Sequence, residues 1–449
     1  MNDTIVAIST ALGVGAISII RVSGEDSIRI VNKIFKGKNL ELVDSHTINY
    51  GYIIEKENII DEVLVSVMKS PKTFTTENVV EINCHGGIST TNKVLELVIR
   101  NGARLAEPGE FTKRAFLNGR IDLIEADGIM NLISSKTEKN RKLAINQLSG
   151  KVSGMVSELR KKLVDIISNI EVNIDYPEYE DIEILTNEKI LPKLNEYKLA
   201  LEQIIKKSSD GKIINEGINV GIVGRPNVGK SSLLNNLLED EKAIVTDIEG
   251  TTRDTVEGTI SVNGILLNII DTAGIRETDN LVEKIGVEKS LEIINKSDLV
   301  ILMLNNNEKL TEEDKKLLNI IKNKKHIVAI NKIDLDSNID YSLEESIKLS
   351  VKDNKGIEEL KQKISEIFNL EQIETEDLTY LTNARSVALL KNALDKINEA
   401  IISINNGEVI DIVEFAIKDA WNVLGEIIGE TYTDELLDNL FSKFCLGKW

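Results

Sequence analysis

The segment GIVGRPNVGKSS, residues 221–232, constrains the fold of this chain more than any other stretch. Gly224 is followed after four residues by Gly229, Lys230 and Ser231, which is the spacing of a loop that binds phosphates. An apolar strand pattern precedes the loop and a helical pattern follows it, as such a loop requires. Backbone amides and the helix N-terminus can hold phosphates, Lys230 can reach the β and γ oxygens, and the Ser231 hydroxyl can bind Mg²⁺.

Alternating strand and helix patterns surround this loop, from residue 217 to about residue 370. Apolar runs such as INVGIV, LVILML and HIVAIN alternate with amphipathic runs such as SSLLNNLL, which predicts a largely parallel sheet covered by helices. The run TISVNGILLNII predicts an antiparallel hairpin that turns at Asn263 and Gly264, because an Asn-Gly pair favours the tight turn of two-residue hairpins. We therefore expect an α/β domain of the P-loop type.

The flanking sequence predicts two further domains, in line with a length of 449 residues, which exceeds what one hydrophobic core supports. Residues 1–120 mix short strand patterns with helices, which indicates an α+β N-terminal domain. Residues 121–214 and 371–449 show helical apolar spacing, interrupted in the first stretch only by Pro177 and Pro192. We predict an α-helical bundle domain made of these two stretches, with the α/β domain of residues 215–370 inserted between them.

A second motif selects the base of the nucleotide. The sequence NKID, residues 331–334, follows the strand pattern HIVAI and so stands at the carboxyl end of a strand, where ligands collect. Asp334 can accept hydrogen bonds from the ring N–H and the amino group of guanine, and adenine offers no such pair of donors. The segment LSVK, residues 349–352, is placed to contact the base as well. The nucleotide expected here is GTP.

Two segments between these motifs are interpreted as switch loops. In TDIEGTTRD, residues 246–254, Thr252 is placed to complete the coordination of Mg²⁺. In DTAG, residues 271–274, Asp271 is placed to hold the metal directly or through water. The next residue is Ile275, whose side chain cannot hydrogen-bond a water molecule. Either this is a weak switch, or another group orients the water that attacks the γ-phosphate.

Composition limits the other classes of function. The net charge of −19 disfavours general binding of polyanions. Residues 134–162 nevertheless carry eight basic and two acidic residues, and they are either a patch that contacts RNA phosphates or a solvated helix face. The two cysteines, Cys84 and Cys445, lack metal-ligand spacing, which argues against a disulfide framework and a zinc site. We recognise no signal peptide and no membrane-spanning run, so we expect a cytoplasmic protein that is not inserted in a membrane.

Strings outside the nucleotide motifs carry a resemblance to a known family. These are GVGAISIIRVSG, HGG and PGEFTKRAFLNGRIDLIEADGIMNLI near the N-terminus, and FCLGK near the C-terminus. Together with the four nucleotide motifs they make the chain similar, over essentially its whole length, to the bacterial tRNA modification GTPases of the MnmE (TrmE) family. The resemblance implies a GTP-hydrolysing enzyme that works with a flavoprotein partner, MnmG (GidA). With it, the family adds a carboxymethylaminomethyl or aminomethyl group to C5 of the wobble uridine of certain tRNAs.

The resemblance also implies a homodimer formed through an N-terminal domain that binds 5-formyl- or 5,10-methylene-tetrahydrofolate. The charge of residues 1–120 is balanced, with 14 Lys and Arg against 14 Asp and Glu, which lowers the electrostatic cost of self-association. The folate contacts implied by the resemblance fall on Arg21, Glu81, Arg120 and Lys448. At each of these positions taken alone, a surface ion pair is the competing interpretation, and many family members have lysine where Arg120 stands.

The motifs and the resemblance together assign residues to the nucleotide and its ions. GTP is expected to contact Asn227, Val228, Gly229, Lys230, Ser231, Ser232, Thr246, Asp247, Ile248, Glu249, Gly250, Thr251, Thr252, Asp271, Thr272, Ala273, Gly274, Asn331, Lys332 and Asp334. Mg²⁺ is assigned to Ser231 and Thr252. The resemblance implies K⁺ as a second cation, held by Asn227, Thr246, Thr251 and the carbonyl of Ile248.

The same resemblance selects one catalytic residue, and a second candidate, Cys445, comes from its own neighbouring residues. It selects Glu283 as the carboxylate that reaches the attacking water, through a bridging water once the G domains of two subunits meet. The competing interpretation is an exposed residue in the first turn of a helix, with Arg276 and Glu277 as the next candidates for catalysis. Cys445, close to Lys448, is either a thiol that acts in the modification step or a packed hydrophobic residue.

Two other classes of function compete with this interpretation. A GTPase switch in ribosome assembly would use its flanking domains to bind RNA or protein, but such factors commonly carry a basic appendage and the C-terminal region here is acidic. A folate-binding module with a decayed GTPase domain is disfavoured because Lys230, Ser231, Asp271 and Asp334 are intact.

Overall fold

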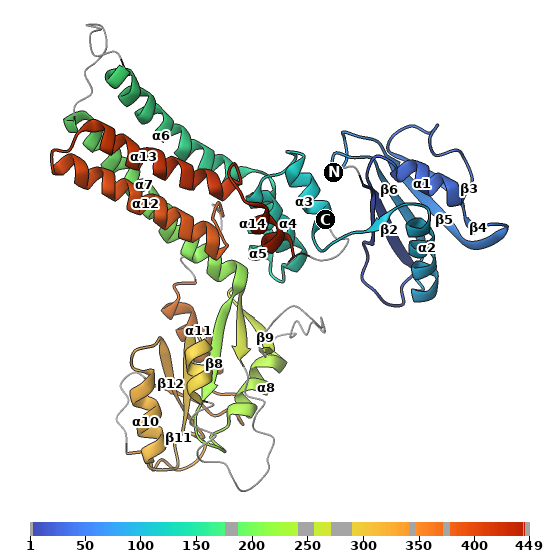
Figure 1. The fold of residues 1–449 in the computed structure, drawn as a ribbon. Coiled ribbons are helices and arrows are strands. Elements are labelled where there is room, and N and C mark those ends of the chain that lie inside the picture. Colours follow the sequence, from blue (N-terminus) through green and yellow to red (C-terminus); the bar gives the residue numbers. More distant parts are fainter. Residues whose placement is uncertain are drawn as a thin grey trace. The chain divides into compact units, whose positions relative to one another are not determined.

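The computed structural model describes residues 3–175, 187–240, 256–270, 290–340, 346–370, 378–442 and 444. The chain divides into two compact units. One consists of Met1–Met130, Gln147–Leu199 and Ala388–Trp449, and the other of Asn131–Asn146 and Ala200–Val387. Figure 1 shows the helices and strands of both. The domain boundaries expected from the sequence, at residues 120, 214 and 370, stay a prediction.

A seven-stranded sheet in the order β3-β4-β5-β6-β2-β1-β7 forms the N-terminal part of the first unit. Strand β7 pairs with β1 in parallel, and the other neighbours are antiparallel. The strands are β1 Ile5–Ile8, β2 Ile17–Ser23, β3 Phe35–Lys36, β4 Thr47–Glu55, β5 Asn58–Met68, β6 Val79–His85 and β7 Arg104–Leu105. The helices are α1 Ser27–Ile34, α2 Ile88–Arg100 and α3 Glu110–Leu117.

The two faces of this sheet differ in burial. Helices α1 and α2 cover one face, and their Val31 and Leu97 belong to a buried cluster with Val65 and Ile82 of the strands. On the opposite face Tyr50 of β4 is exposed, as are other apolar residues of β4 and β5 described below. An antiparallel sheet commonly has one face in the core and one towards solvent, but the open face is usually polar. The exposed apolar residues therefore mark a surface that can bind another protein.

The helical part of the first unit joins segments that are far apart in the sequence. Helices α6 Lys151–Asp175, α13 Ile410–Ile428 and α14 Asp434–Phe441 lie wholly in this unit. The division between the units falls within α4 Leu123–Ser134, α5 Glu138–Leu148, α7 Asn187–Glu216 and α12 Ala384–Asn405. Helices α6 and α13 pack side by side (Figure 1). The guanidinium of Arg160 lies 4.2 Å from the ring centroid of Trp421 and donates to the Trp421 carbonyl over 3.3 Å. The expected packing of the two helical stretches into one bundle is thus confirmed.

The expectation that Pro192 interrupts the helical pattern is wrong. Pro192 lies inside α7, which begins at Asn187. A proline at this sixth position removes one helical hydrogen bond, because only the first four amides of a helix have no partner within it, and α7 continues through Pro192. Pro177 lies outside the described residues.

The second unit contains a six-stranded sheet in the order β13-β12-β11-β8-β10-β9. Its strands are β8 Ile218–Val223, β9 Val256–Val262, β10 Ile265–Ile270, β11 Leu299–Asn305, β12 His326–Asn331 and β13 Ile347–Lys348. Strand β9 is antiparallel to β10 and the other neighbours are parallel. Asn263 and Gly264 have φ of 51° and 76°, which is the left-handed geometry of the hairpin turn expected from the sequence.

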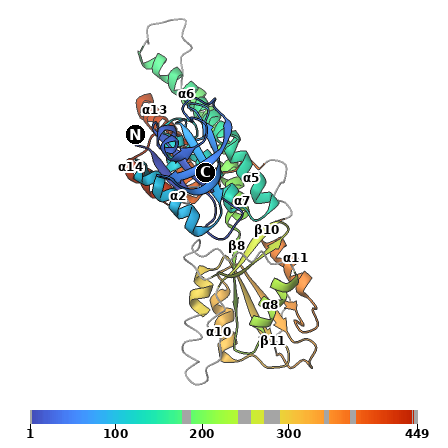
Figure 2. The ribbon, with the colours of Figure 1, turned by 90° about the vertical axis from the view of Figure 1, so that its right-hand side faces the viewer.

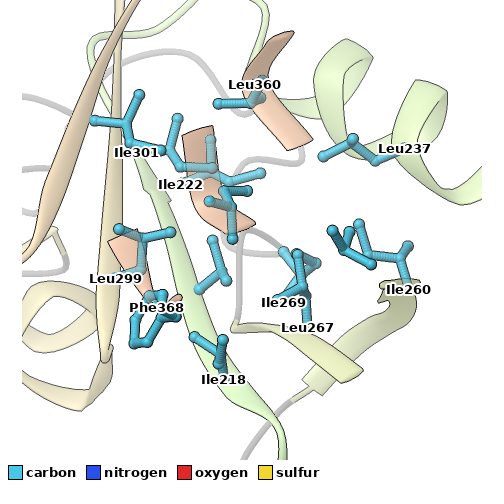
Figure 3. Close-up of a cluster of buried hydrophobic side chains, with 14 of the residues drawn as sticks. Ile218, Ile222, Leu237, Ile260, Leu267, Ile269, Leu299, Ile301, Leu360 and Phe368 are labelled. Carbon is cyan, nitrogen blue, oxygen red and sulfur yellow. The ribbon is translucent and has the colours of Figure 1, made fainter. Parts of the chain in front are cut away.

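Helices cover both faces of this sheet: α8 Lys230–Asp240 and α11 Ile357–Ile367 on one face, and α10 Glu312–Ile321 on the other (Figure 2). Residues of β11 alternate between the two buried clusters, with Ile301 in the first and Leu302 in the second. Figure 3 shows the first cluster, in which Leu237 of α8 and Leu360 of α11 meet the strands.

The fold class expected from the sequence is therefore confirmed: an α+β N-terminal domain, a helical domain and an inserted α/β domain of the P-loop type. In the described part of the chain, no helix combines the length and the apolar character needed to cross a membrane.

Candidate functional site

The phosphate loop lies between β8 and α8 and has an unusual backbone. Gly224, Asn227 and Gly229 have φ of 146°, 64° and 103°. A Cβ on Gly224 would lie 2.5 Å from the carbonyl oxygen of Met303, at the end of β11, so only glycine fits there. Left-handed residues turn successive amides towards one point, and helix α8 begins at the end of the loop, so the segment is built to hold an anion.

Lys230 is tied to the loop it follows. Its Nζ donates to the carbonyls of Gly224 and Arg225, over 2.7 Å in each case. Burial lowers the pKa of Lys230 to about 8, because removal from water disfavours the ammonium. A bound polyphosphate would favour the charged form again. Lys230 is therefore in place to serve as the cation of a phosphate site.

The NKID and LSVK segments meet the phosphate loop at the carboxyl ends of the strands. Asn331 is 4% exposed. Its Nδ2 donates to the carbonyl of Val228 over 2.9 Å, and its Oδ1 accepts from the amide of Val351 over 3.2 Å. Ser350 Oγ donates to Asp334 Oδ1 over 2.9 Å. One amide side chain thus links the phosphate loop to the base-contacting loop, and one hydroxyl orients the carboxylate expected to recognise guanine.

The structure brings together the described part of the expected GTP site. Residues 227–232 and the NKID residues, with Lys332 at φ of 65°, lie at one end of the parallel strands. Other expected residues lie outside the described residues: Thr246, Asp247, Ile248, Glu249, Gly250, Thr251, Thr252, Asp271, Thr272, Ala273, Gly274, Ile275, Arg276, Glu277, Glu283, Cys445 and Lys448. The two switch loops, the candidate catalytic glutamate and the C-terminal cysteine therefore stay predictions.

Of the oxygens assigned to cations, Ser231 and Asn227 are described. Both are exposed, Ser231 as the second residue of α8 and Asn227 within the loop. A hydroxyl and an amide oxygen are hard donors that suit Mg²⁺ and K⁺. Among the described residues, no group of three or more His, Cys, Asp or Glu side chains lies close enough together to hold a metal.

The residues expected to contact folate are partly gathered in the N-terminal domain. Arg21 of β2 faces Glu81 of β6 across the strands, and its Nε and Nη2 lie 2.8 and 2.7 Å from Glu81 Oε1. The pair is an internal one, because the side chain of Arg21 is only 4% exposed. The guanidinium carbon of Arg21 lies 5.8 Å from the centroid of the Phe111 ring.

Arg120 lies over the ring of Phe74, which packs in one buried cluster with Phe111. Its guanidinium carbon is 5.3 Å from the centroid of Phe74, and Phe74 and Phe111 belong to one cluster. Arg120 also donates to the carbonyl of Thr73. Both arginines and Glu81 therefore border one cluster, and cationic and carboxylate groups there suit a ligand with an anionic tail and an amino edge.

A buried ionic network was missed by reading the sequence. Arg114 is 1% exposed and donates to Asp3 Oδ1, Glu77 Oε1 and Glu110 Oε1 over 2.8, 3.0 and 2.9 Å. The spacing of Glu110 and Arg114, one helical turn apart, was the only local signal. The other two partners lie 111 and 37 residues away along the chain. Arg225, discussed below, was missed for the same reason.

Comparison with protein families and curated proteins gives strong matches. The profile described as "MnmE helical domain" matches residues 123–445, and "GTP-binding protein TrmE N-terminus" matches residues 4–120. A "tRNA modification GTPase MnmE" from Streptococcus thermophilus is 51% identical over 450 residues, covering 99% of this chain and 98% of that protein. The protein of the same name from Bacillus cytotoxicus is 50% identical over 455 residues, covering 99% of each.

Solved structures give weaker likenesses. Era from Aquifex aeolicus, bound to GDP and AlF4⁻, is 29% identical and covers 40% of this chain and 66% of that chain, with a TM-score of 0.26. The G domain of FeoB from T. maritima is 29% identical and covers 33% of this chain and 98% of that chain, with a TM-score of 0.24. Scores this low support no conclusion.

Proposed function

The chain belongs to the MnmE family of tRNA modification GTPases, and from this premise we propose the reaction that it drives. In the cytoplasm, with a flavoprotein partner of the MnmG (GidA) type, GTP hydrolysis drives addition of a carboxymethylaminomethyl or aminomethyl group to C5 of the wobble uridine of certain tRNAs. The observation that carries the proposal is a sequence identity of 50–51% to MnmE proteins over 99% of this chain. The match spans the N-terminal, helical and α/β parts together.

Guanine selection is the task of the loops at the carboxyl end of β12. Asp334 accepts hydrogen bonds from the ring N–H and the amino group of guanine, and Ser350 fixes the orientation of its carboxylate. Asp334 is exposed in this structure, so a base without these donors would remove water from its carboxylate without replacing the lost hydrogen bonds, which costs about 1–3 kcal/mol. The Asn331 amide keeps this loop in register with the phosphate loop.

Phosphate binding is the task of the loop amides and Lys230. The Lys230 ammonium, which donates to the carbonyls of Gly224 and Arg225 in this structure, would donate to the β and γ oxygens of the nucleotide in place of these carbonyls or together with them. Ser231 and Thr252 would hold Mg²⁺, which neutralises charge on the same oxygens. The helix dipole of α8 adds to the attraction.

Water activation needs a group other than Ile275, whose side chain cannot hydrogen-bond a water molecule. We propose that Glu283 positions the attacking water and that Asn227, Thr246, Thr251 and the Ile248 carbonyl hold K⁺, which supplies positive charge near the transition state. Replacing Na⁺ by K⁺ should then raise GTP turnover strongly. Glu283→Ala should lower turnover by ~10² with GTP affinity little changed, as for a positioned acid or base. Equal rates in both salts, or a fully active alanine variant, would leave Arg276 and Glu277 as candidates.

We further propose that the open sheet face of the N-terminal domain forms a homodimer contact beside the folate site. Ile48, Tyr50 and Leu64 on this face are 69%, 56% and 47% exposed. Tyr50 faces Leu64, Leu64 faces Asn83, and Glu81 stands two residues before Asn83 on the same strand. Since residues opposite each other in an antiparallel pair share a face, the Arg21–Glu81 pair lies on the face that carries the exposed apolar residues.

The dimer proposal has a direct test. Leu64→Asp places a carboxylate on the open face without touching the buried cluster beneath α1 and α2, so the whole chain should sediment as a monomer while keeping the circular dichroism spectrum of the folded protein. Ser66→Asp, opposite Glu81, would add a like charge beside the pair and should also weaken binding of 5-formyl-tetrahydrofolate. A Leu64→Asp variant that remained dimeric at micromolar concentration would rule out this face.

The modification itself is tested in cells. Mass analysis of wobble nucleosides in tRNA from cells that lack this chain should show loss of the carboxymethylaminomethyl or aminomethyl group. Unchanged wobble uridines would favour a role in ribosome assembly instead. In cells that carry Cys445→Ser, GTP hydrolysis should persist while tRNA modification falls, and full modification would make Cys445 a packing residue.

A further inference from the structure

Arg225, the second residue of the phosphate loop, has side-chain contacts outside the loop. Its Nε donates to Asp314 Oδ1 over 2.9 Å, and its Nη2 donates to Glu308 Oε2 over 3.1 Å. The side chain of Asp314 is 1% exposed and that of Arg225 is 18% exposed. This is a largely buried ion pair with a charge-assisted hydrogen bond, the kind of contact that fixes geometry.

Asp314 is itself held rigidly. It lies in the first turn of α10, where its Oδ2 accepts from the amide and the hydroxyl of Thr311 over 3.0 and 2.9 Å. Thr311 Oγ1 accepts in return from the Asp314 amide over 3.3 Å, which completes a capping box. The anchor for Arg225 is therefore a carboxylate that two other bonds already position.

Glu308 connects the anchor of Arg225 to the NKID segment. Its Oε1 accepts from Nδ2 of the buried Asn305 over 2.9 Å. Asn306, which follows Asn305 in the chain, donates its backbone amide to the carbonyl of Asn331 over 2.8 Å. Its Nδ2 donates to the carbonyl of Leu335 over 3.1 Å. The segment after β11 thus contacts both the phosphate loop, through Arg225, and the NKID segment.

The backbone of Arg225 contacts the phosphate-binding lysine. Its carbonyl accepts from Lys230 Nζ, while its side chain runs to Asp314. Arg225 lies between Gly224 and Asn227, both at positive φ, and the left-handed conformation of a residue such as Asn227 is costly without support. A tether at Arg225 holds the first half of the loop in the conformation in which its amides and Lys230 are ready for phosphates.

We propose that Arg225 is a positioning residue for nucleotide binding, which acts by tying the phosphate loop to Asp314 and Glu308. The proposal rests on the GTP site proposed above. Without the tether, nucleotide binding must order the loop itself, and this ordering opposes binding. Nucleotide should therefore dissociate faster, while recognition of the base stays the same.

The test uses the whole chain and GDP that carries a fluorescent N-methylanthraniloyl group on its ribose. Arg225→Gln should speed dissociation of this nucleotide by about 10-fold, and Arg225→Lys, which keeps the charge but not the two-pronged geometry, by an intermediate factor. The matched control is Thr433→Ala. It removes the side-chain cap of α14, away from the tether, and should lower the melting temperature, with dissociation unchanged. If Arg225 only stabilised the fold, Arg225→Gln would lower the melting temperature and leave dissociation unchanged, as the control does.

Two further variants keep the outcomes distinct. Lys230→Ala should abolish binding of the labelled GDP, and if binding persists, the proposed GTP site is wrong. If Lys230→Ala abolishes binding while Arg225→Gln releases GDP at the wild-type rate, the positioning role is wrong. Should Arg225→Gln fail to fold, Glu308→Gln at the 44% exposed end of the tether takes its place. It should speed dissociation by about 3-fold, and a wild-type rate there would also overturn the proposal.

Discussion

Replacement of Gly229 by alanine tests the geometry of the nucleotide site most sharply. Gly229 has φ of 103°, and a Cβ built on it would lie 2.3 Å from Nδ2 of Asn331. Real Cβ atoms do not approach other atoms this closely, so either the loop or the Asn331 side chain must move. That side chain is the link between the phosphate loop and the base-contacting loop.

The free-energy cost of Gly229→Ala follows from the contacts that Asn331 would lose. Its bonds to the Val228 carbonyl and the Val351 amide are both buried. Leaving such groups without a partner costs about 1–3 kcal/mol each, and alanine at this φ adds roughly 1–3 kcal/mol of backbone strain. The sum is at least ~3 kcal/mol, so the affinity for GTP should fall by ~100-fold or more if the bound conformation carries this cost.

The assay is equilibrium binding of GTP to the Gly229→Ala variant, together with its thermal unfolding. The control is Gly102→Ala, at φ of 120°, where the nearest atom to a new Cβ is a methyl carbon of Ile30 at 3.8 Å. That variant has the backbone strain without the collision, and it should bind GTP normally. Wild-type affinity in Gly229→Ala would refute the reasoning, because the link through Asn331 would then carry no binding energy.

Three further predictions concern other contacts. Ser350→Ala removes the 2.9 Å bond that orients Asp334 and should weaken GTP binding by about 5- to 10-fold, roughly 1 kcal/mol; an unchanged dissociation constant in a fluorescence titration would count against it. Because burial lowers the pKa of Lys230 to about 8 and bound phosphates raise it again, GTP binding should take up a proton above pH 8. The dissociation constant should then rise between pH 8 and 9, by at most about tenfold per pH unit, and a constant value from pH 7 to 9 would contradict this. Arg114→Met removes the buried cation from Glu77 and Glu110, of which Glu110 keeps its ion pair with Arg104, and should lower the free energy of unfolding by about 1–3 kcal/mol in urea titrations, with GTP affinity unchanged; an unchanged free energy of unfolding would show that the network relaxes.

Local sequence signals predicted the elements of the α/β domain because those elements obey local rules. The Asn263-Gly264 hairpin and the loop before Lys230 depend on backbone preferences of a few adjacent residues. Nearly continuous apolar runs likewise marked β8 and β12, since a strand between two helical layers is buried on both faces. The expected insertion of this domain into a helical bundle came from the change of pattern on either side.

Long-range polar partners could not be predicted in the same way. Arg225 lies 89 residues from Asp314, and Arg114 lies 111 residues from Asp3, so nothing in the local pattern identifies either pair. Arg21 and Glu81 were singled out by motif as separate ligand contacts, yet strand register places them opposite each other. Pro192 looked like a break because proline disfavours helix interiors, yet the 30-residue helix α7 continues through it at the cost of one hydrogen bond.

The proposed role of GTP hydrolysis at the Lys230 site is to drive modification of the wobble uridine. It is tested most directly by the wobble nucleosides of tRNA from cells whose only copy of this chain carries Lys230→Ala, compared with Lys315→Ala on the exposed side of α10. The account predicts loss of the modified nucleoside in the first strain and its full presence in the second, at equal protein levels. A normal content of the modified nucleoside in the Lys230→Ala strain would contradict the claim.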